Sequence, residues 1–180
     1  LSDLAVDRVA DRVVVACSHA AQEFEECAAI ALQKVRGQVT ATTATEASAR
    51  LRCCLHYGGY ASPAVRGIHV IGASFQRWLD HTDLLPDDDR DNLTKLEAVA
   101  PGITAGMELV SARASLRATA RDQVPVVGAI SERIYVTLGH RSHGILSSLI
   151  AAQILTAMID GRVPPVGGET LRCLDPGRFF

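Results

Sequence analysis

The alternation of apolar and polar residues predicts where strands lie in this chain. Residues 12–17 (Arg-Val-Val-Val-Ala-Cys) form a short β-branched run that is typical of a buried strand. The clearest period covers residues 110–121, where every second residue is apolar and the residues between are Ser, Thr or Arg. Arg113, Arg117 and Arg121 also lie four residues apart, as on one face of a helix, but the sustained alternation favours a strand with a basic face.

Shorter strand-like runs fill the middle of the chain. Residues 39–71 are strand-like, and a Gly-Gly pair at 58–59 separates residues 51–57 from residues 60–65, which predicts a hairpin. The stretch 53–56 (Cys-Cys-Leu-His) is interpreted as strand interior and not as a zinc site. Further strands are expected at residues 69–71 and 133–138, and the apolar run 124–128 precedes the latter.

Two helices are predicted. Pro86 and the acidic run 87–91 precede apolar residues at helical spacing, and a Pro-Gly pair at 101–102 ends the helix. The acidic run is expected to be solvated, because carboxylates are favourable at a helix start. Residues 145–159 predict a second, buried helix, and residues 171–180 a loop or a docked extension.

The order of these elements predicts an α/β (α+β) fold with a β-rich insertion. Strand and helix come first, then mostly strands, then strand and helix again, so the chain is expected to cross between two domains twice. The expected boundaries are 1–35, 36–118 and 119–180. With 180 residues, 48% of them apolar and 21% charged, the chain can bury one sizeable core or two small ones, and disorder is not expected.

The net charge and the cysteines limit which partners and which cellular compartment are expected. A net charge of −2 gives no global basic field, so a nucleic-acid partner needs a local patch or another part of the protein. Five cysteines without CxxC spacing suit neither a disulfide framework nor a zinc site, and a reducing cytoplasm fits best. No signal peptide is expected at the start, and residues 145–159 are shorter than the roughly 20 residues that a bilayer span needs.

Residues 139–144 (Gly-His-Arg-Ser-His-Gly) lie between a predicted strand and an apolar helix. Such a junction presents free backbone N–H groups at a helix start, and its glycines let an anion or an electron-rich ring edge approach the backbone. The alternative is a plain strand-to-helix loop. His140 and His143 have no carboxylate or cysteine at ligand spacing, so they are expected to line the loop and to bind no metal.

Four segments, in chain order, resemble the D-amino acid oxidase superfamily of FAD-dependent oxidoreductases. They are residues 13–19, 36–38, 117–128 (an Arg-x-x-x-x-Asp-x-x-Pro-x-x-Gly pattern) and 135–145. The resemblance implies a partial FAD-binding Rossmann-like domain, formed by 1–35 and 119–180, with an inserted mainly β substrate domain at 36–118. It also implies FAD-binding residues: Ser18, Gly37, Gly128, Gly139, His140, Arg141, Ser142, His143, Gly144 and Ile145.

Three further segments are similar to the oxidase module of the bifunctional enzymes that modify the wobble uridine of tRNA. They are residues 57–63 (Tyr-Gly-Gly-Tyr-Ala-Ser-Pro), 71–75 (Ile-Gly-Ala-Ser-Phe) and 171–179. The resemblance covers nearly the whole chain. It implies oxidative removal of the carboxymethyl group from carboxymethylaminomethyl(thio)uridine in tRNA, which leaves aminomethyluridine for a separate methyltransferase module.

The chain departs from the family pattern in two places. No Gly-x-Gly-x-x-Gly follows a strand, so the segment that would hold the FAD pyrophosphate is missing and the chain alone is expected to bind FAD poorly. Ser18 stands where the family usually has glycine. The methyltransferase module is also missing, so the chain is interpreted as a carboxyl-terminal fragment.

Arg117 and Tyr60 are the candidate catalytic residues. Arg117 matches the superfamily's substrate arginine, and a guanidinium binds a carboxylate in a bidentate way; the alternative is a solvated strand arginine. Tyr60 either borders the pocket or simply packs on the sheet. Two other functions stay open: a glycine or D-amino acid oxidase acting on free amines, and a catalytically silent fragment.

Overall fold

The computed structural model describes residues 10–180, which divide into two compact units. The first unit contains the described residues up to Lys34 together with Arg117–Phe180, and the second contains Val35–Leu116. Strands β2 (Leu32–Thr43) and β6 (Leu109–Ala120) run from one unit into the other. The strand predicted from alternation at residues 110–121 is therefore confirmed.

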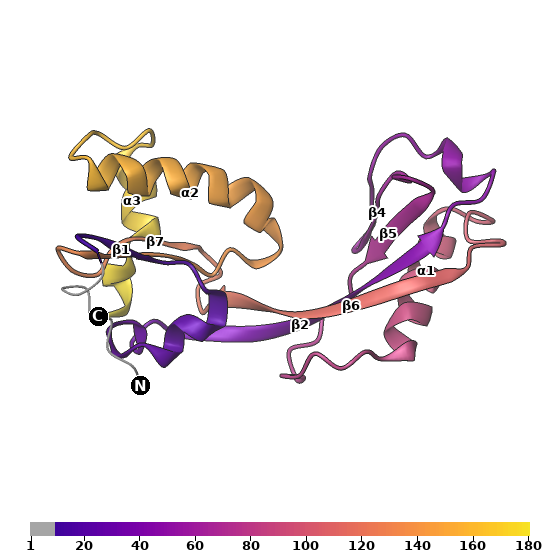
Figure 1. Ribbon diagram of the computed structural model, residues 1–180, viewed down its shortest axis with the longest axis horizontal. Coiled ribbons are helices and arrows are strands. Elements are labelled where there is room, and N and C mark those ends of the chain that lie inside the picture. Colours follow the sequence, from indigo (N-terminus) through magenta and orange to yellow (C-terminus); the bar gives the residue numbers. More distant parts are fainter. Residues whose placement is uncertain (1–9) are drawn as a thin grey trace. The chain divides into compact units, whose positions relative to one another are not determined.

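The first unit is built on a three-stranded sheet with the order β1-β8-β7, and Figure 1 labels β1 and β7. Strand β1 (Val13–Val15) runs parallel to β8 (Ile134–Leu138), while β7 (Val126–Ala129) is antiparallel to β8. The strands predicted at residues 12–17 and 133–138 are confirmed, and the apolar run 124–128 contributes most of β7. Because β8 has neighbours on both sides, all its polar backbone groups can pair while its side chains face two cores.

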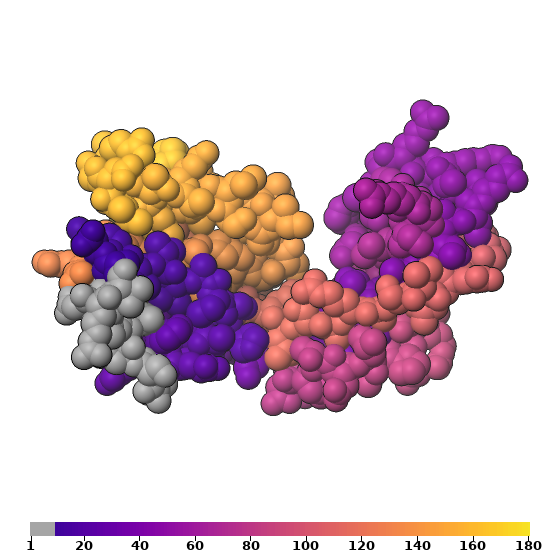
Figure 2. Space-filling model, in the orientation of Figure 1, coloured from indigo at the N-terminus to yellow at the C-terminus, as the bar shows by residue number. Residues whose placement is uncertain are grey.

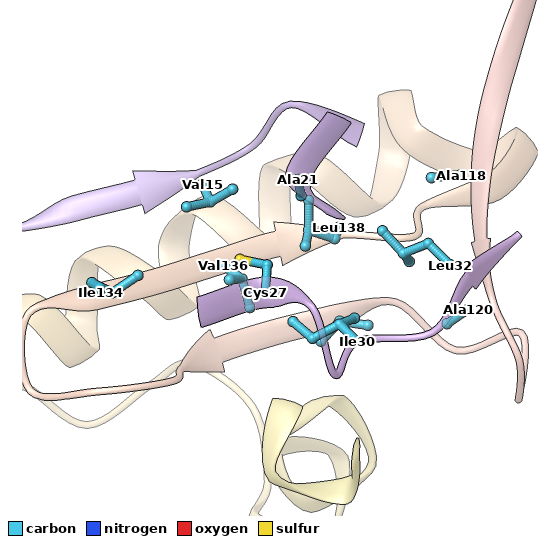
Figure 3. Packing of buried hydrophobic residues seen from close by; sticks show 11 residues of the cluster. Val15, Ala21, Cys27, Ile30, Leu32, Ala118, Ala120, Ile134, Val136 and Leu138 are labelled. Carbon is cyan, nitrogen blue, oxygen red and sulfur yellow. The ribbon is translucent and has the colours of Figure 1, made fainter. Parts of the chain in front are cut away.

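The two faces of this sheet carry separate apolar clusters. Ile134, Val136 and Leu138 point to one face, where they pack with Cys27 and other residues of the segment that precedes β2 (Figure 3). That segment forms two short 3-10 helices, η2 (Ser18–Glu23) and η3 (Glu25–Cys27). Tyr135 belongs to the opposite cluster, with helix α2. The period of two along β8 thus builds both layers.

Helix α2 (Gly144–Ile159) follows β8 and is buried on one side only. Ala151, Ile154 and Leu155 pack in the cluster with Tyr135, but Ile145, Leu146 and Leu149 are 89%, 74% and 67% exposed. The expectation of a buried helix is therefore wrong for its first half, whose side chains form part of the surface in Figure 2. By length and composition alone, the helical stretch Arg141–Ile159 could also cross a membrane.

The carboxyl-terminal residues are helical and docked, so of the two expected alternatives, a loop or a docked extension, the docked extension is confirmed. Helix α3 (Gly168–Leu174) and the 3-10 helix η6 (Pro176–Phe179) both pack against β7. Pro176 is buried, and a Cβ placed on Gly128 of β7 would meet its Cδ at 2.7 Å. Glycine at this position therefore lets the tail approach the sheet.

The second unit contains a sheet with the order β3-β4-β5-β2-β6. The hairpin predicted at the Gly-Gly pair is confirmed, with β3 (Leu55–His56) antiparallel to β4 (Tyr60–Ala61) and Gly58 at φ +88°. Strand β5 (Ile68–Gly72) pairs with β4 and β2. The 3-10 helix η4 covers Ser48–Arg50. Cys53 and Cys54 are exposed and precede β3, so their reading as strand interior is wrong.

Helix α1 (Pro86–Val99) confirms the predicted first helix, but its acidic start is only partly solvated. Asp88 is 3% exposed and forms an ion pair with Arg36 of β2, which is fully buried. Arg36 also donates to Gln76 Oε1 at 2.6 Å and to Gln38 Oε1 at 2.9 Å. The buried arginine thereby joins β2, the segment after β5 and the start of α1.

We expect Arg36→Leu to lower the free energy of unfolding by roughly 3–5 kcal/mol, because Asp88 would stay buried without its cation. Urea unfolding followed by circular dichroism measures this. Arg50→Leu is the matched control: the side chain of Arg50 is 80% exposed, it faces Glu46 at 3.6 Å, and its removal should leave the free energy unchanged within error. Equal effects of the two substitutions would contradict the assignment of Arg36 as the polar anchor of the second unit.

Candidate functional site

The loop from Gly139 to Gly144, called the glycine loop below, joins β8 to α2 and needs glycine at its first position. Gly139 is buried and has φ +70°, in the left-handed region that residues with a side chain rarely adopt. A Cβ placed on it would lie 3.3 Å from the backbone nitrogen of Ala120. Two independent constraints, conformation and space, therefore act on this residue.

His140 fastens the glycine loop to both neighbouring elements. Its Nε2 lies 2.7 Å from Oγ1 of Thr137 in β8, and its Nδ1 lies 2.8 Å from Oγ of Ser147 in α2. Ser147 donates its hydroxyl proton to the carbonyl of His143 at 2.9 Å, so its oxygen accepts from Nδ1–H of His140. Nε2 is then free to accept from Thr137, which requires a neutral ring.

Burial also lowers the pKa of His140 below its ordinary value of 6.5. The hydrogen bonds and the burial thus favour the same protonation state. His140 acts as an uncharged brace at this junction, in keeping with the expectation that it lines the loop.

The start of α2 offers backbone donors. In the described part of the chain no side chain caps this helix, and the residues before it form the short 3-10 helix η5 (Arg141–His143). Ser142, His143 and Ile145 are exposed, and only Cβ of His140, at 3.6 Å, would contact a Cβ built on Gly144. Uncapped N–H groups at the positive end of a 16-residue helix suit an anion or the electron-rich edge of a ring.

A cavity of about 430 Å³ lies between the sheet and α2. Its walls are mainly apolar, and His140 and Thr137 contribute polar groups at the loop end. The lining residues are Val14, Ala16, Thr137, His140, Ser148, Ala152, Leu155, Thr156 and Ile159. Since β1 and β8 are parallel, the segments that follow them meet at one edge of the sheet, which is where ligands bind in open α/β folds.

Ser18 follows β1 at that same edge. Its φ of +58° places it in the left-handed region, where glycine carries no steric cost. This conformation gives a physical reason for the glycine that the sequence resemblance implies at this position. Serine keeps the turn at the cost of backbone strain and adds a hydroxyl group at the edge.

The remaining candidate residues lie elsewhere. Arg117 is half-buried in the first unit on β6, and it has an interaction partner. Gly37 is buried in β2 and Tyr60 is half-buried in β4, both in the second unit. Gly128 lies against Pro176, so tail packing accounts for this glycine. The structure brings together the glycine loop, Ile145 and the edge that carries Ser18, and the roles of all the candidate residues stay predictions.

Sequence reasoning missed the side chains that hold the loop. Thr137 and Ser147 fix the ring of His140, and a hydroxyl residue at each end of the junction was the available signal. It also missed the bond from Nη1 of Arg141 to the carbonyl of Gln123, at 3.3 Å, since the two residues lie 18 positions apart.

We expect His140 to make the stability of the fold depend on pH. Its folded pKa is lowered, so its contribution is fully present above the unfolded value of about 6.5 and is lost as the pH falls through the folded pKa. Thermal unfolding of wild type and His140→Gln between about pH 8 and pH 5 measures this. The advantage of wild type should shrink towards acid; an advantage that grows towards acid would show a charged ring in the folded state.

Most of the chain matches a known protein family. Residues 3–158 match the family described as FAD dependent oxidoreductase. The chain is 34% identical over 173 residues to the tRNA 5-methylaminomethyl-2-thiouridine biosynthesis bifunctional protein MnmC of Idiomarina loihiensis, covering 94% of this chain and 28% of that protein. The protein of the same name from Chromobacterium violaceum is 29% identical over 204 residues, covering 96% of this chain and 31% of its own length.

Solved structures share the fold. Glycine oxidase from Geobacillus kaustophilus superposes with a TM-score of 0.80 at 20% identity, covering 92% of this chain and 45% of the oxidase. The chain therefore spans less than a third of the curated relatives named above and less than half of this structure. The resemblance inferred from the sequence is confirmed at the level of the family: the chain belongs to the FAD-dependent oxidoreductases.

Proposed function

We propose that this chain is the carboxyl-terminal part of an FAD-dependent oxidase module that removes the carboxymethyl group from carboxymethylaminomethyl(thio)uridine at the tRNA wobble position. The product is aminomethyluridine. The observation that carries this proposal is the match to the MnmC proteins along 94% of the chain, a length that spans the glycine loop. The proposed location is the cytoplasm, where tRNA is modified.

The glycine loop fits the edge of a flavin ring. Gly139 allows close approach, the uncapped start of α2 supplies N–H donors, and the neutral ring of His140 holds the loop without adding charge. FAD, when bound, supplies the oxidising chemistry by accepting a hydride from the substrate carbon next to the amine. Residues 139–145 are the proposed contacts with the ring, and Ser18 is the proposed contact at the neighbouring turn.

A further segment of the same module is proposed to complete the FAD site. Strand β1 is the edge of its sheet, with its second side unpaired in the described residues, and the first half of α2 exposes large apolar side chains, among them Ile145, Leu146 and Leu149. A parallel strand pair normally lies inside a sheet that is covered on both faces. A strand and helix that carry the missing Gly-x-Gly-x-x-Gly would bury this surface and hold the pyrophosphate, and a separate methyltransferase module would act on the product.

The substrate is an N-substituted glycine, so the site must bind a carboxylate. Arg117 is the proposed partner, since it matches the superfamily's substrate arginine. It is half-buried in the last four residues of β6, which belong to the first unit. Tyr60 is the second candidate; the hydroxyl of Tyr57 donates to its backbone carbonyl at 3.2 Å, so its strand end is fixed. No general base is required if the neutral amine loses a hydride, and orientation is then the work of the protein.

Oxidation of a small free amine is the second candidate function, because the fold is shared with glycine oxidase. The two differ in the substrate that they accept. Turnover of modified tRNA with little oxidation of glycine or sarcosine supports the tRNA function, and comparable rates with the free amines overturn it.

We expect the 180-residue chain to purify without flavin, and a longer protein that includes the preceding residues to purify with FAD. The reason is that the pyrophosphate segment lies outside this sequence. Visible absorbance of both preparations at equal protein concentration measures the difference. A yellow preparation of the short chain with one FAD per chain would contradict the proposed division of the site.

In the full-length protein we expect Arg117→Ala to lower kcat/KM for carboxymethylaminomethyl-modified tRNA about 30-fold to several thousand-fold, equivalent to roughly 2–5 kcal/mol. Arg113→Ala is the control, because Arg113 lies on the same strand and is exposed. Flavin reduction should slow while tRNA affinity holds. If both substitutions have equal, small effects, another residue binds the carboxylate.

A further inference from the structure

Arg178, in the docked tail, uses every donor of its guanidinium. Nε donates to Oδ2 of Asp122 at 2.6 Å. Nη1 donates to the carbonyls of Leu174 and Asp175 at 2.8 and 2.9 Å, and Nη2 to those of Val124 and Pro125 at 2.9 and 3.1 Å. The side chain is only 19% exposed. Five donors in a planar fork are a property of arginine that lysine lacks.

The acceptors of Arg178 lie in two segments, so the side chain ties them together. Leu174 and Asp175 belong to the tail, whereas Asp122, Val124 and Pro125 form the turn between β6 and β7. Asp122 also accepts from the backbone N–H of Val124 at 3.0 Å. Burial acts to raise the pKa of Asp122, but the bond and charge of Arg178 and the backbone bond outweigh it and lower the pKa. The pair is therefore charged at neutral pH.

The same turn contacts the glycine loop. Gln123, at the middle of the turn, has φ +64°, and its carbonyl accepts from Nη1 of Arg141 at 3.3 Å. Arg141 has φ +58°, a conformation that a residue with a side chain adopts only when its surroundings hold it. Two left-handed residues thus brace each other, one in the turn that Arg178 holds and one inside the glycine loop.

We infer that Arg178 is a positioning residue for the glycine loop, acting through the turn at Asp122–Pro125 and the side chain of Arg141. The hydrogen bonds of Arg178 described above all end on the tail and the turn, so its effect on the loop is indirect. The consequence for a flavin rests on the proposed function, whereas the mechanical link between tail and loop does not. The inference also gives the Asp-Pro-Gly-Arg-Phe ending a role beyond covering β7.

Amide hydrogen exchange in the full-length protein, followed by mass spectrometry, tests the link. Arg178→Gln should speed exchange at least about tenfold in peptides that cover both residues 121–125 and residues 139–144. Arg172→Gln is the matched control, because Arg172 lies in the same tail but is exposed, and it should change neither peptide. Arg178→Lys, which keeps the charge beside Asp122 but lacks the fork, should fall between wild type and Arg178→Gln.

The route through Arg141 is tested in a second background. In Arg141→Gln, the glycine loop should already exchange faster, and adding Arg178→Gln should then loosen only residues 121–125. Faster exchange of the turn with an unchanged glycine loop would overturn the inference, as would an equal further effect of Arg178→Gln on the loop in both backgrounds. Thermal unfolding of each variant shows that it is folded, and Arg178→Lys keeps the test decisive if Arg178→Gln does not fold.

Flavin binding separates this inference from the proposed function. In full-length protein, Arg178→Gln should raise the Kd for FAD about tenfold and change the visible flavin spectrum, while Arg172→Gln leaves both unchanged. If full-length wild type binds no flavin, the proposed function fails, but hydrogen exchange still decides whether the tail positions the loop.

Discussion

The position of the glycine loop depends on the burial of β8 on both faces. Ile134, Val136 and Leu138 are held in one apolar cluster and Tyr135 in the other, so a shift of the strand by one residue would exchange the two sets. The pairings with β1 and β7 fix the same register. Because the strand cannot slide, Gly139 follows β8 beside Ala120, where glycine avoids both a tight contact and an unfavourable backbone conformation. The cofactor contacts proposed for the glycine loop therefore depend on the packing of β8 in the two apolar clusters.

Two polar side chains, His140 and Arg141, then fix the position of the glycine loop relative to its neighbouring elements. The neutral ring of His140 ties the end of β8 to the first turn of α2, and Arg141 ties the loop to the turn before β7. In the second unit, buried Arg36 does comparable work for the start of α1. The half-buried ring of His140 depends on both of its partners, since a buried polar group that loses one costs more than an apolar replacement.

Periodicity and turn residues were enough to predict most strands, the hairpin at the Gly-Gly pair and α1. The errors have a common physical origin. Asp88 was expected to be exposed to solvent and α2 was expected to be buried. A local pattern indicates which residues are apolar and which are polar, but it does not show which distant segment packs against them. Arg36 lies 52 positions before Asp88, and no local rule links them.

Some residues of the candidate site could be predicted from the sequence and others could not. The contiguous motif at residues 139–145 was visible in the sequence, because strand, glycine and helix follow one another and the family resemblance fixed their order. Thr137, Ser147 and Gln123, which hold that motif, were not visible, since their roles depend on bonds that only the folded chain forms. Ser18 has a left-handed backbone conformation, which glycine adopts without steric cost. The sequence alone showed only that serine replaces the expected glycine, and not that the backbone conformation is the reason for expecting it.

The exposed half of α2 links the fold to the proposed cofactor site. Fully burying a leucine or isoleucine side chain contributes roughly 1.5–3 kcal/mol, and Ile145, Leu146 and Leu149 are all in the first two turns of the helix, directly after the glycine loop. A segment that covered them would also restrain the N–H groups at the helix start. Under the proposed function, docking of that segment and binding of FAD would therefore stabilise the same two turns, and each would favour the other. Under this proposal, the exposed apolar side chains of α2 and the glycine loop belong to the same binding site.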